Sequence, residues 1–267
     1  MTTQATVEIK IDEAFEHFPK APIVEAVIDI QARAAAAFDE SSVRSHLEAR
    51  LNGYSFLDSR REFRHELQLE VEDGTPPSQK LHDLGWKGLR FRSADEKHIA
   101  QFNRDGFVFS RLEPYMDWQQ LSNEGLKLWK VFKELAQPAE IHRIGLRFIN
   151  RVLLPQGELR FEDYMQPAPV SPVGMDLPFQ GFMHHDTLAV PGHPYAITVI
   201  RTIQLPPHSG GLGVALILDI DVFTIQGFGL DEAMLVYRLK EMRWLKNKVF
   251  LGSVTDKARE VFRCTSK

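Results

Sequence analysis

Three arginines at intervals of four occupy one stretch in which apolar and polar residues alternate. Arg143, Arg147 and Arg151 fall on one side of a predicted strand over residues 140–154, and apolar residues occupy the other side. Positions four apart on one face of a strand are about 13 Å apart, so these arginines would be spread along a surface. Guanidinium groups bind phosphate and carboxylate in planar, bidentate geometry. The pattern therefore favours a sheet face that recognises an anionic ligand.

The arginine side of this strand has a second interpretation, in which carboxylates on neighbouring strands neutralise it. Cross-strand pairs of opposite charge are common in antiparallel sheets, so acidic residues often match a strip of arginines. The acidic residues of other predicted strands that could form such pairs are Glu66, Glu70, Asp219 and Asp221. An open anion-binding face and an ion-paired face therefore both fit the sequence.

Two of these carboxylates also suggest a metal site. Asp219 and Asp221 stand two apart in a predicted strand over residues 213–224, so both point to the same face. Carboxylate oxygens hold magnesium or manganese, but such sites need several oxygen ligands, and no third acidic residue follows at a recognisable spacing. A metal-dependent phosphate-processing enzyme that uses Asp219 and Asp221 is thus the alternative hypothesis. The main hypothesis requires no cofactor.

A further arginine and two aromatic residues mark the junction between a predicted strand and a predicted helix. Arg111 ends the strand, and Tyr115 and Trp118 follow it at the start of the helix. Exposed aromatic rings at this place could stack on a base or anchor a partner, whereas buried ones would pack the junction. We include all three residues in the predicted ligand-binding set and leave both interpretations of the rings open.

Other residue types that often carry catalysis show no recognisable pattern. His184 and His185 are adjacent in a predicted strand, so their side chains point to opposite faces. The sequence has no HExxH, no paired CxxC and no GxSxG, and its glycine-rich stretch at 209–213 precedes a strand instead of a helix. These observations favour a non-enzymatic binding or regulatory protein that recognises a nucleotide, a nucleic acid or an acidic segment.

The elements that must position these residues occur in the same order in both halves of the chain. Each half begins with a strand and a helical segment, continues with several strands and ends with a long helix. The first half has predicted strands at 23–33, 61–71, 88–93, 99–103 and 106–111 and helices at 42–51 and 116–135. The second half has strands at 140–154, 180–190, 195–205 and 213–224 and helical segments at 161–165, 231–250 and 255–262.

Runs of strands closed by a helix are typical of an α+β fold. We therefore predict two pseudo-repeated halves, residues 1–137 and 138–267, each made of antiparallel sheet and a long helix, within one or two domains. The alternative is a single helix-grip fold, in which one curved sheet wraps around the C-terminal helix.

Composition excludes several classes of protein. The 267 residues are 43% hydrophobic and 25% charged, as in ordinary globular proteins, and the net charge of −4 excludes a strongly basic protein that coats nucleic acid. The single cysteine, Cys264, excludes an intramolecular disulfide framework and a cysteine-rich zinc site. No signal peptide or membrane-spanning run is recognisable, so a cytoplasmic location is expected.

The predicted helix over residues 231–250 carries more large aromatic residues than one buried stripe requires. Tyr237, Trp244 and Phe250 lie off the apolar stripe, which consists of Leu235, Leu239, Met242, Leu245 and Val249. A second buried contact would account for them. Either the helix at 255–262 folds back onto them, or a twofold partner covers them; we predict a homodimer through this region.

Three stretches resemble a sporadically distributed family of uncharacterised bacterial proteins. They are APIVEAV at residues 21–27, FVFSRLEPY at 107–115 together with Trp118, and RIGLRFINR at 143–151. The resemblance implies a full-length member of about the usual size, and it implies no particular activity. The patchy distribution of the family implies an accessory role, such as a function associated with mobile elements or defence.

Overall fold

The computed structural model describes residues 6–68, 78–154, 160–175, 177, 179, 181–204 and 213–263. Within them lies one sheet of nine strands in the order β2-β3-β4-β5-β1-β6-β9-β8-β7, and every neighbouring pair is antiparallel. The strands are β1 Ile23–Gln31, β2 Tyr54–Gln68, β3 Ser78–Ser93, β4 His98–Asn103, β5 Gly106–Leu112, β6 Arg143–Leu153, β7 Met183–Ala189, β8 Tyr195–Gln204 and β9 Ala215–Thr224. Cys264 and the glycine-rich residues 209–212 lie outside this part of the chain.

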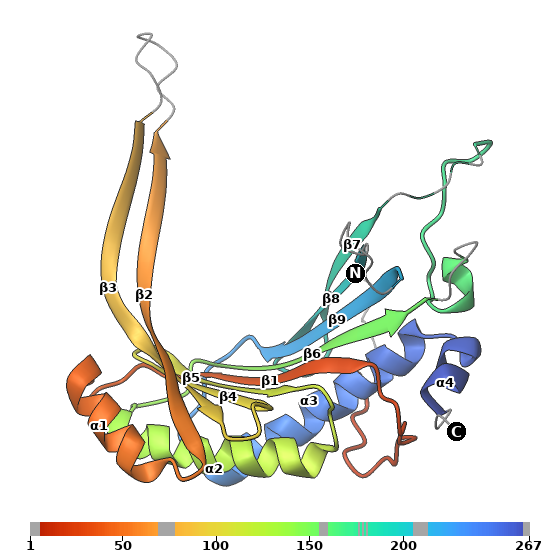
Figure 1. Cartoon of the computed structure of the whole chain (residues 1–267). Coiled ribbons are helices and arrows are strands. Elements are labelled where there is room, and N and C mark those ends of the chain that lie inside the picture. Colours follow the sequence, from red (N-terminus) through yellow and green to blue (C-terminus); the bar gives the residue numbers. More distant parts are fainter. Residues whose placement is uncertain are drawn as a thin grey trace.

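The helices pack on one face of the sheet, which confirms the α+β class (Figure 1). They are α1 Glu40–Arg50, α2 Trp118–Ala136, α3 Glu232–Ser253 and α4 Asp256–Arg263, with one 3₁₀ turn, η1 Phe161–Asp163. Helix α2 packs against β5, and α3 packs against β6 and β9. Each half thus has its own long helix, in contrast to a sheet wrapped around the C-terminal helix alone.

The two halves meet where β1 and β6 pair side by side in the centre of the sheet. Strand β5, the last strand of the first half, pairs with β1, and β9, the last strand of the second half, pairs with β6. The order β3-β4-β5-β1 is therefore repeated in reverse as β6-β9-β8-β7, which confirms the pseudo-repeat. The predicted boundary after residue 137 falls between α2 and β6, and one continuous sheet crosses it.

Alternating side chains divide the central strands into an apolar and a polar face. Ile28 of β1, Phe109 of β5 and Phe148 of β6 are buried beneath the sheet among the helices. Helix α2 approaches this face closely, since a Cβ built on Gly125 would lie 3.0 Å from Ile28 Cδ1 and 3.1 Å from Phe109 Cδ1. The pattern of α2 predicts an apolar face made of Trp118, Leu121, Leu128, Trp129 and Phe132. The last four are buried because they cover β5, and Trp118 is half-buried.

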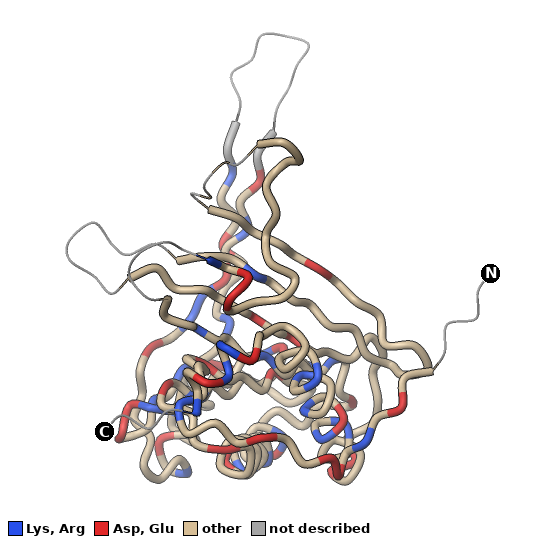
Figure 2. The backbone as a smooth tube through the Cα atoms, turned by 90° about the vertical axis from the view of Figure 1, so that its right-hand side faces the viewer, with Lys and Arg blue, Asp and Glu red and all other residues tan. Residues whose placement is uncertain are grey.

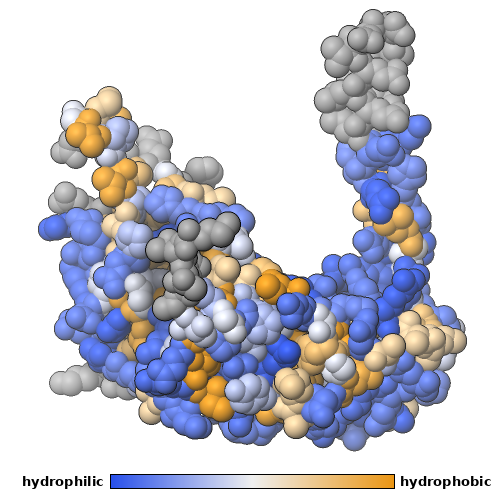
Figure 3. Space-filling view, turned by 180° about the vertical axis from the view of Figure 1, so that it is seen from behind, coloured by the Kyte–Doolittle hydropathy of each residue, from blue (hydrophilic) through white to orange (hydrophobic). Residues whose placement is uncertain are grey.

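The sheet extends beyond the helices into two arms, and the surface between them is hollowed (Figures 1 and 3). One arm is the β2–β3 hairpin. The sequence predicts strands at 61–71 and 88–93 with no strand between them, but residues 78–87 also belong to β3, because this segment pairs with the distal end of β2. Register shifts along the hairpin, as between Phe56 and Asp58, are bulges that add bend and twist to such ladders.

The C-terminal helix folds back within the chain. Phe250 of α3 and Phe262 of α4 pack with Phe18, which precedes β1, at ring-centroid distances of 5.7–6.4 Å. Trp244 is 8% exposed, and its indole Nε1 donates a hydrogen bond to Glu13 Oε2 at 2.7 Å. Contacts inside the chain thus cover two of the three aromatic residues behind the dimer hypothesis, and Tyr237 is half exposed. The homodimer stays a prediction.

None of the helices in the described residues has both the length and the apolar character needed to cross a bilayer.

The start of β5 lies so close to β1 that only glycine fits. A Cβ on Gly106 would lie 2.3 Å from the carbonyl oxygen of Ile30 and 2.9 Å from Gln31 Cα, both backbone atoms. We expect Gly106→Ala to lower the free energy of unfolding by more than about 2 kcal/mol, measured by urea unfolding, because the backbone pairing must shift. The control is Gly252→Ala in α3, where a Cβ meets nothing within 4 Å and helix propensity adds up to about 1 kcal/mol of stability. Equal stability of the two variants would contradict this account.

Candidate functional site

The first two arginines of β6 are held by carboxylates on the open face of the sheet. Arg143 donates hydrogen bonds to Asp29 Oδ2 at 3.1 Å and to Asp221 Oδ2 at 3.0 Å. Arg147 makes a bidentate pair with Asp219, with N···O distances of 2.8 and 2.5 Å. Both guanidinium groups are therefore engaged by neighbours on β1 and β9.

The third arginine has a carboxylate partner as well. Arg151 donates to the two carboxylate oxygens of Glu113 at 3.2 and 3.3 Å. The ion-paired interpretation of this strip thus describes the arrangement in the structure. Asp219 and Asp221, the pair suggested for a metal, are each bound by an arginine, and no group of three or more His, Cys, Asp or Glu side chains is placed to hold a metal ion in the described part of the chain.

Carboxylates outnumber guanidinium groups in the hollow above these strands. Its charged lining consists of Arg143 and Arg147 together with Glu25, Asp29 and Asp221. Burial raises the pKa of Asp29 and of Asp221, and the neighbouring Arg143 only partly opposes that effect on either pKa. Charges of both signs are also interspersed along the whole chain (Figure 2). An anion that enters this hollow therefore finds both arginines already occupied.

Arg111 does not join the β6 arginines. It lies on the helix-side face of β5, in alternation with Phe107 and Phe109, and its side chain is mostly buried. Its guanidinium donates to the carbonyl oxygen of Pro114 at 2.9 and 3.2 Å and contacts His98 Nε2 at 3.0 Å. Arg111 thus fixes the turn that follows β5.

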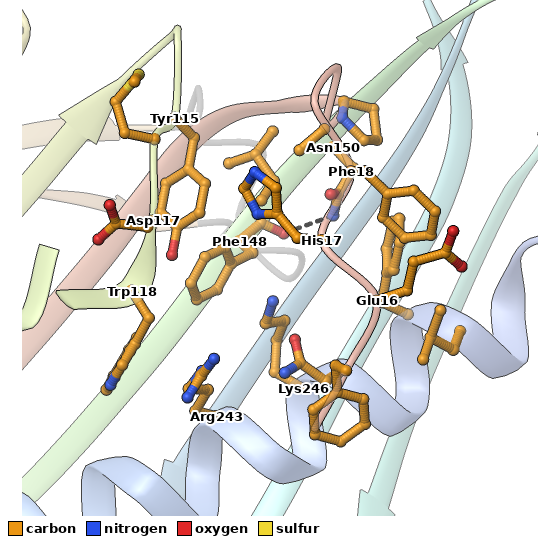
Figure 4. A pocket seen from close by; sticks show the side chains of 18 residues that line it. Glu16, His17, Phe18, Tyr115, Asp117, Trp118, Phe148, Asn150, Arg243 and Lys246 are labelled. Carbon is orange, nitrogen blue, oxygen red and sulfur yellow. Dashed lines mark hydrogen bonds between the residues drawn. The ribbon is translucent and has the colours of Figure 1, made fainter. Parts of the chain in front are cut away.

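Tyr115 and Trp118 line a pocket between the sheet and α3 (Figure 4). The pocket is partly open to solvent and has a volume of about 160 Å³, and its walls come from the segment before β1, the junction before α2, strand β6 and helix α3. Tyr115 packs edge-to-face on Phe148 of β6 at 5.6 Å, and Arg243 of α3 lies over the Trp118 ring at 5.6 Å. The other polar side chains of the lining are Glu16, His17, Asp117, Asn150, Lys246 and Asn247.

Lys246 enters this pocket from α3 and is only 8% exposed. Its amine lies 4.0 Å from the centroid of the Phe148 ring. No side chain in the described residues forms an ion pair or hydrogen bond with this amine, and Arg243 is the one charged group that acts on it strongly. Burial, assisted by the charge of Arg243, lowers the pKa of Lys246 to about 7. The amine therefore exists in charged and neutral forms near neutral pH.

The two carboxylates that line the pocket are committed elsewhere. Asp117 caps α2, where its Oδ1 accepts a hydrogen bond from the backbone N–H of Gln120 at 2.8 Å. Glu16 accepts hydrogen bonds from the guanidinium of Arg263, which lowers the pKa of the Glu16 carboxyl. Lys246 and Arg243 thus line the pocket without an ion pair to either of these carboxylates in the described residues.

Neither cation belonged to the ligand-binding set predicted from the sequence. The signal was nevertheless present, because Lys246 occupies an inward position of α3, seven residues after Leu239 and four after Met242. A lysine on a buried stripe is rare unless it has a partner or a function. Arg243 lies one turn earlier, off the apolar stripe of the helix, where an arginine is ordinary, so the sequence did not mark it as functional.

Comparison of the chain with models of protein families and with curated proteins finds no match. The family resemblance of the three sequence stretches is thus neither supported nor opposed by these comparisons.

Replacing the buried amine should change how stability depends on pH. Between pH 7 and 10.5 the unfolded chain binds more protons at Lys246 than the folded chain, so this lysine makes stability rise with pH in that window. Lys246→Met lacks the burial penalty and should be more stable than the parent at pH 6, by a few kcal/mol, since each pKa unit corresponds to about 1.4 kcal/mol. The gain should shrink towards pH 10.

Chemical unfolding at both pH values measures this effect. Lys240→Met, on the exposed side of the same helix, is the matched control and should show no gain that depends on pH. A Lys246→Met variant that is less stable than the parent at pH 6, or that shows the same difference at both pH values, would contradict a buried charge without a partner.

Proposed function

We propose that the protein is a binding protein for a small organic anion, which it holds in the pocket between β6, α3 and the segment before β1. The observation that carries this proposal is the pair of cations, Lys246 and Arg243, that line one pocket while the carboxylates around them have other partners. A bound anion would supply the missing counter-charge.

The electrostatics of the pocket favour such a ligand. A buried charge without a partner destabilises the fold, and an anion that approaches it removes much of that penalty. Coulomb attraction is also several times stronger in a partly desolvated pocket than in water. Arg243 offers planar, bidentate donors for a carboxylate, and its position over the Trp118 ring limits its orientation.

Size restricts the class of ligand. A space of about 160 Å³ is close to the volume of cavities that accept one benzene-sized molecule, well below that of typical sites for drug-sized ligands. A carboxylic acid with a few carbon atoms fits this volume. The proposal therefore keeps the anionic ligand expected from the sequence and narrows it to a small organic acid.

The arginine-bearing face of β6 and the metal-dependent alternative use different residues, so one set of variants separates all three. Arg151 represents the sheet face, Arg243 represents the pocket, and Asp221 represents the metal hypothesis. Arg151 pairs with Glu113, and Arg243 lies over the Trp118 ring. Each substitution therefore removes a cation and one contact within the chain.

The test is a thermal-shift and calorimetric titration of the full chain with acetate, propionate, succinate and inorganic phosphate. We expect at least one carboxylate to raise the melting temperature and bind the parent. Arg243→Gln should weaken binding about tenfold or more, because it removes hydrogen bonds between charged groups. Arg151→Gln should bind as the parent does.

Other outcomes would place the function elsewhere. Binding that is lost in Arg151→Gln and kept in Arg243→Gln would assign the anion to the sheet face and overturn the pocket. Stabilisation by magnesium or manganese that is lost in Asp221→Asn would support the phosphate-processing alternative. No stabilisation by any member of the panel would also contradict the proposal.

A further inference from the structure

The amine of Lys246 has the surroundings of a nucleophile. The residue is more than nine-tenths buried, and its amine lies against the face of an aromatic ring in the lining of the pocket. A lysine amine attacks carbonyl carbon only in its neutral form, and desolvation beside another cation is a recognised way to keep it neutral. An adjacent carboxylate would hold the amine in its charged form, and the described residues place none there.

Arg243 stands three residues before Lys246 on the same helix. Residues at this spacing share one face, with Cβ atoms about 5–6 Å apart. Both side chains line the pocket, and Figure 4 shows them side by side above α3. One small molecule could therefore place a carboxylate on the guanidinium while its neighbouring carbon lies near the amine.

A phenol lines the same pocket. Tyr115 packs against Phe148, the ring whose centroid lies 4.0 Å from the Lys246 amine. Burial raises the pKa of Tyr115, so the phenol keeps its proton and can donate a hydrogen bond. The pocket thus combines a nucleophile, a carboxylate-binding group and a hydrogen-bond donor.

We propose that the small organic anion of this pocket is a 2-oxo acid and that Lys246 holds it as a reversible imine. This inference rests on the proposed function and adds the chemical class of the ligand. Arg243 binds the carboxylate, and the 2-oxo carbon, one bond away from it, lies towards Lys246 on the same face of α3.

The chemistry balances without an oxidant or reductant. The lone pair of Lys246 Nζ attacks the 2-oxo carbon, a C–N bond forms, and the π electrons of the carbonyl move to its oxygen, which takes a proton. The nitrogen then loses its proton to water, the oxygen takes a second proton from solvent, and the C–O bond breaks as the oxygen leaves as water. The net change is amine plus ketone to imine plus water, and hydrolysis reverses it.

The experiment traps the imine in the folded chain. The protein is incubated with pyruvate and sodium cyanoborohydride, which reduces an iminium to a stable secondary amine, and peptide mass spectrometry locates the adduct. We expect one adduct per chain, at Lys246. Lys246→Arg should lose it, and the matched control Lys240→Met should keep it. Arg243→Gln should reduce the rate of labelling by about tenfold or more.

A second measurement does not depend on any variant. The rate of labelling at Lys246 in the parent protein should reach half of its maximum near pH 7, whereas an ordinary lysine requires a pH near 10.

Propionate, which has the carboxylate and lacks the ketone, should protect Lys246 from pyruvate. Acetone, which has the ketone and lacks the carboxylate, should label it slowly.

The outcomes separate this inference from the proposed function. Binding of propionate that depends on Arg243, together with no adduct from pyruvate, would overturn the imine and leave the anion site in place. No binding of any carboxylate would overturn both. Labelling of many lysines at similar rates, or labelling of Lys246 that is unchanged in Arg243→Gln, would overturn the inference as well.

Discussion

The pairing of β1 with β6 is the contact on which the rest of the structure depends. It is the one place in the sheet order where a strand of the first half lies beside a strand of the second, within the described residues. Because β1 also pairs with β5 and β6 with β9, this contact fixes the register of both halves at once. It also fixes the pocket, since the segment that enters β1 and the strand β6 form neighbouring walls of it.

The cations on the two sides of β6 differ in whether they have carboxylate partners. On the open face, each arginine meets a carboxylate, so the charges there contribute to cross-strand pairing and leave little net field. On the helix-side face, Arg243 and Lys246 of α3 line the pocket, and neither forms an ion pair with a carboxylate of the described residues. Cations without an ion-pair partner lower the stability of a fold, and such arrangements are usually found at binding sites.

Local patterns in the sequence were enough to predict most of the elements. The alternation in β6 correctly separated Ile144, Leu146 and Phe148 from the arginines, and the stripe on α3 correctly marked Leu235, Leu239 and Met242 as buried. The order of strands and helices also predicted the pseudo-repeat. These successes rest on periodicity, which is a property of the chain itself.

What failed depends on the register between distant segments. The partners of Arg143 are Asp29 and Asp221, which lie far away in the sequence and meet it only through β1 and β9. The extension of β3 to Ser78 follows from its pairing with β2, and no local pattern marks it. Lys246 was visible as a lysine on a buried stripe, but its meaning required the positions of Glu16 and Asp117, whose partners only the folded chain defines.

The central position of β1 has a consequence for how the chain reaches this fold during synthesis. Strand β1 leaves the ribosome early, and β5 can cover one of its edges soon afterwards, but the strand that covers its other edge begins only at Arg143. Until then an apolar strand with Ile23, Ala26 and Ile28 has a free row of backbone donors and acceptors, which is the kind of edge that recruits other chains. Long-range pairing of this kind also slows folding. The growing chain is therefore most exposed to aggregation in the interval between the completion of β5 and the arrival of β6.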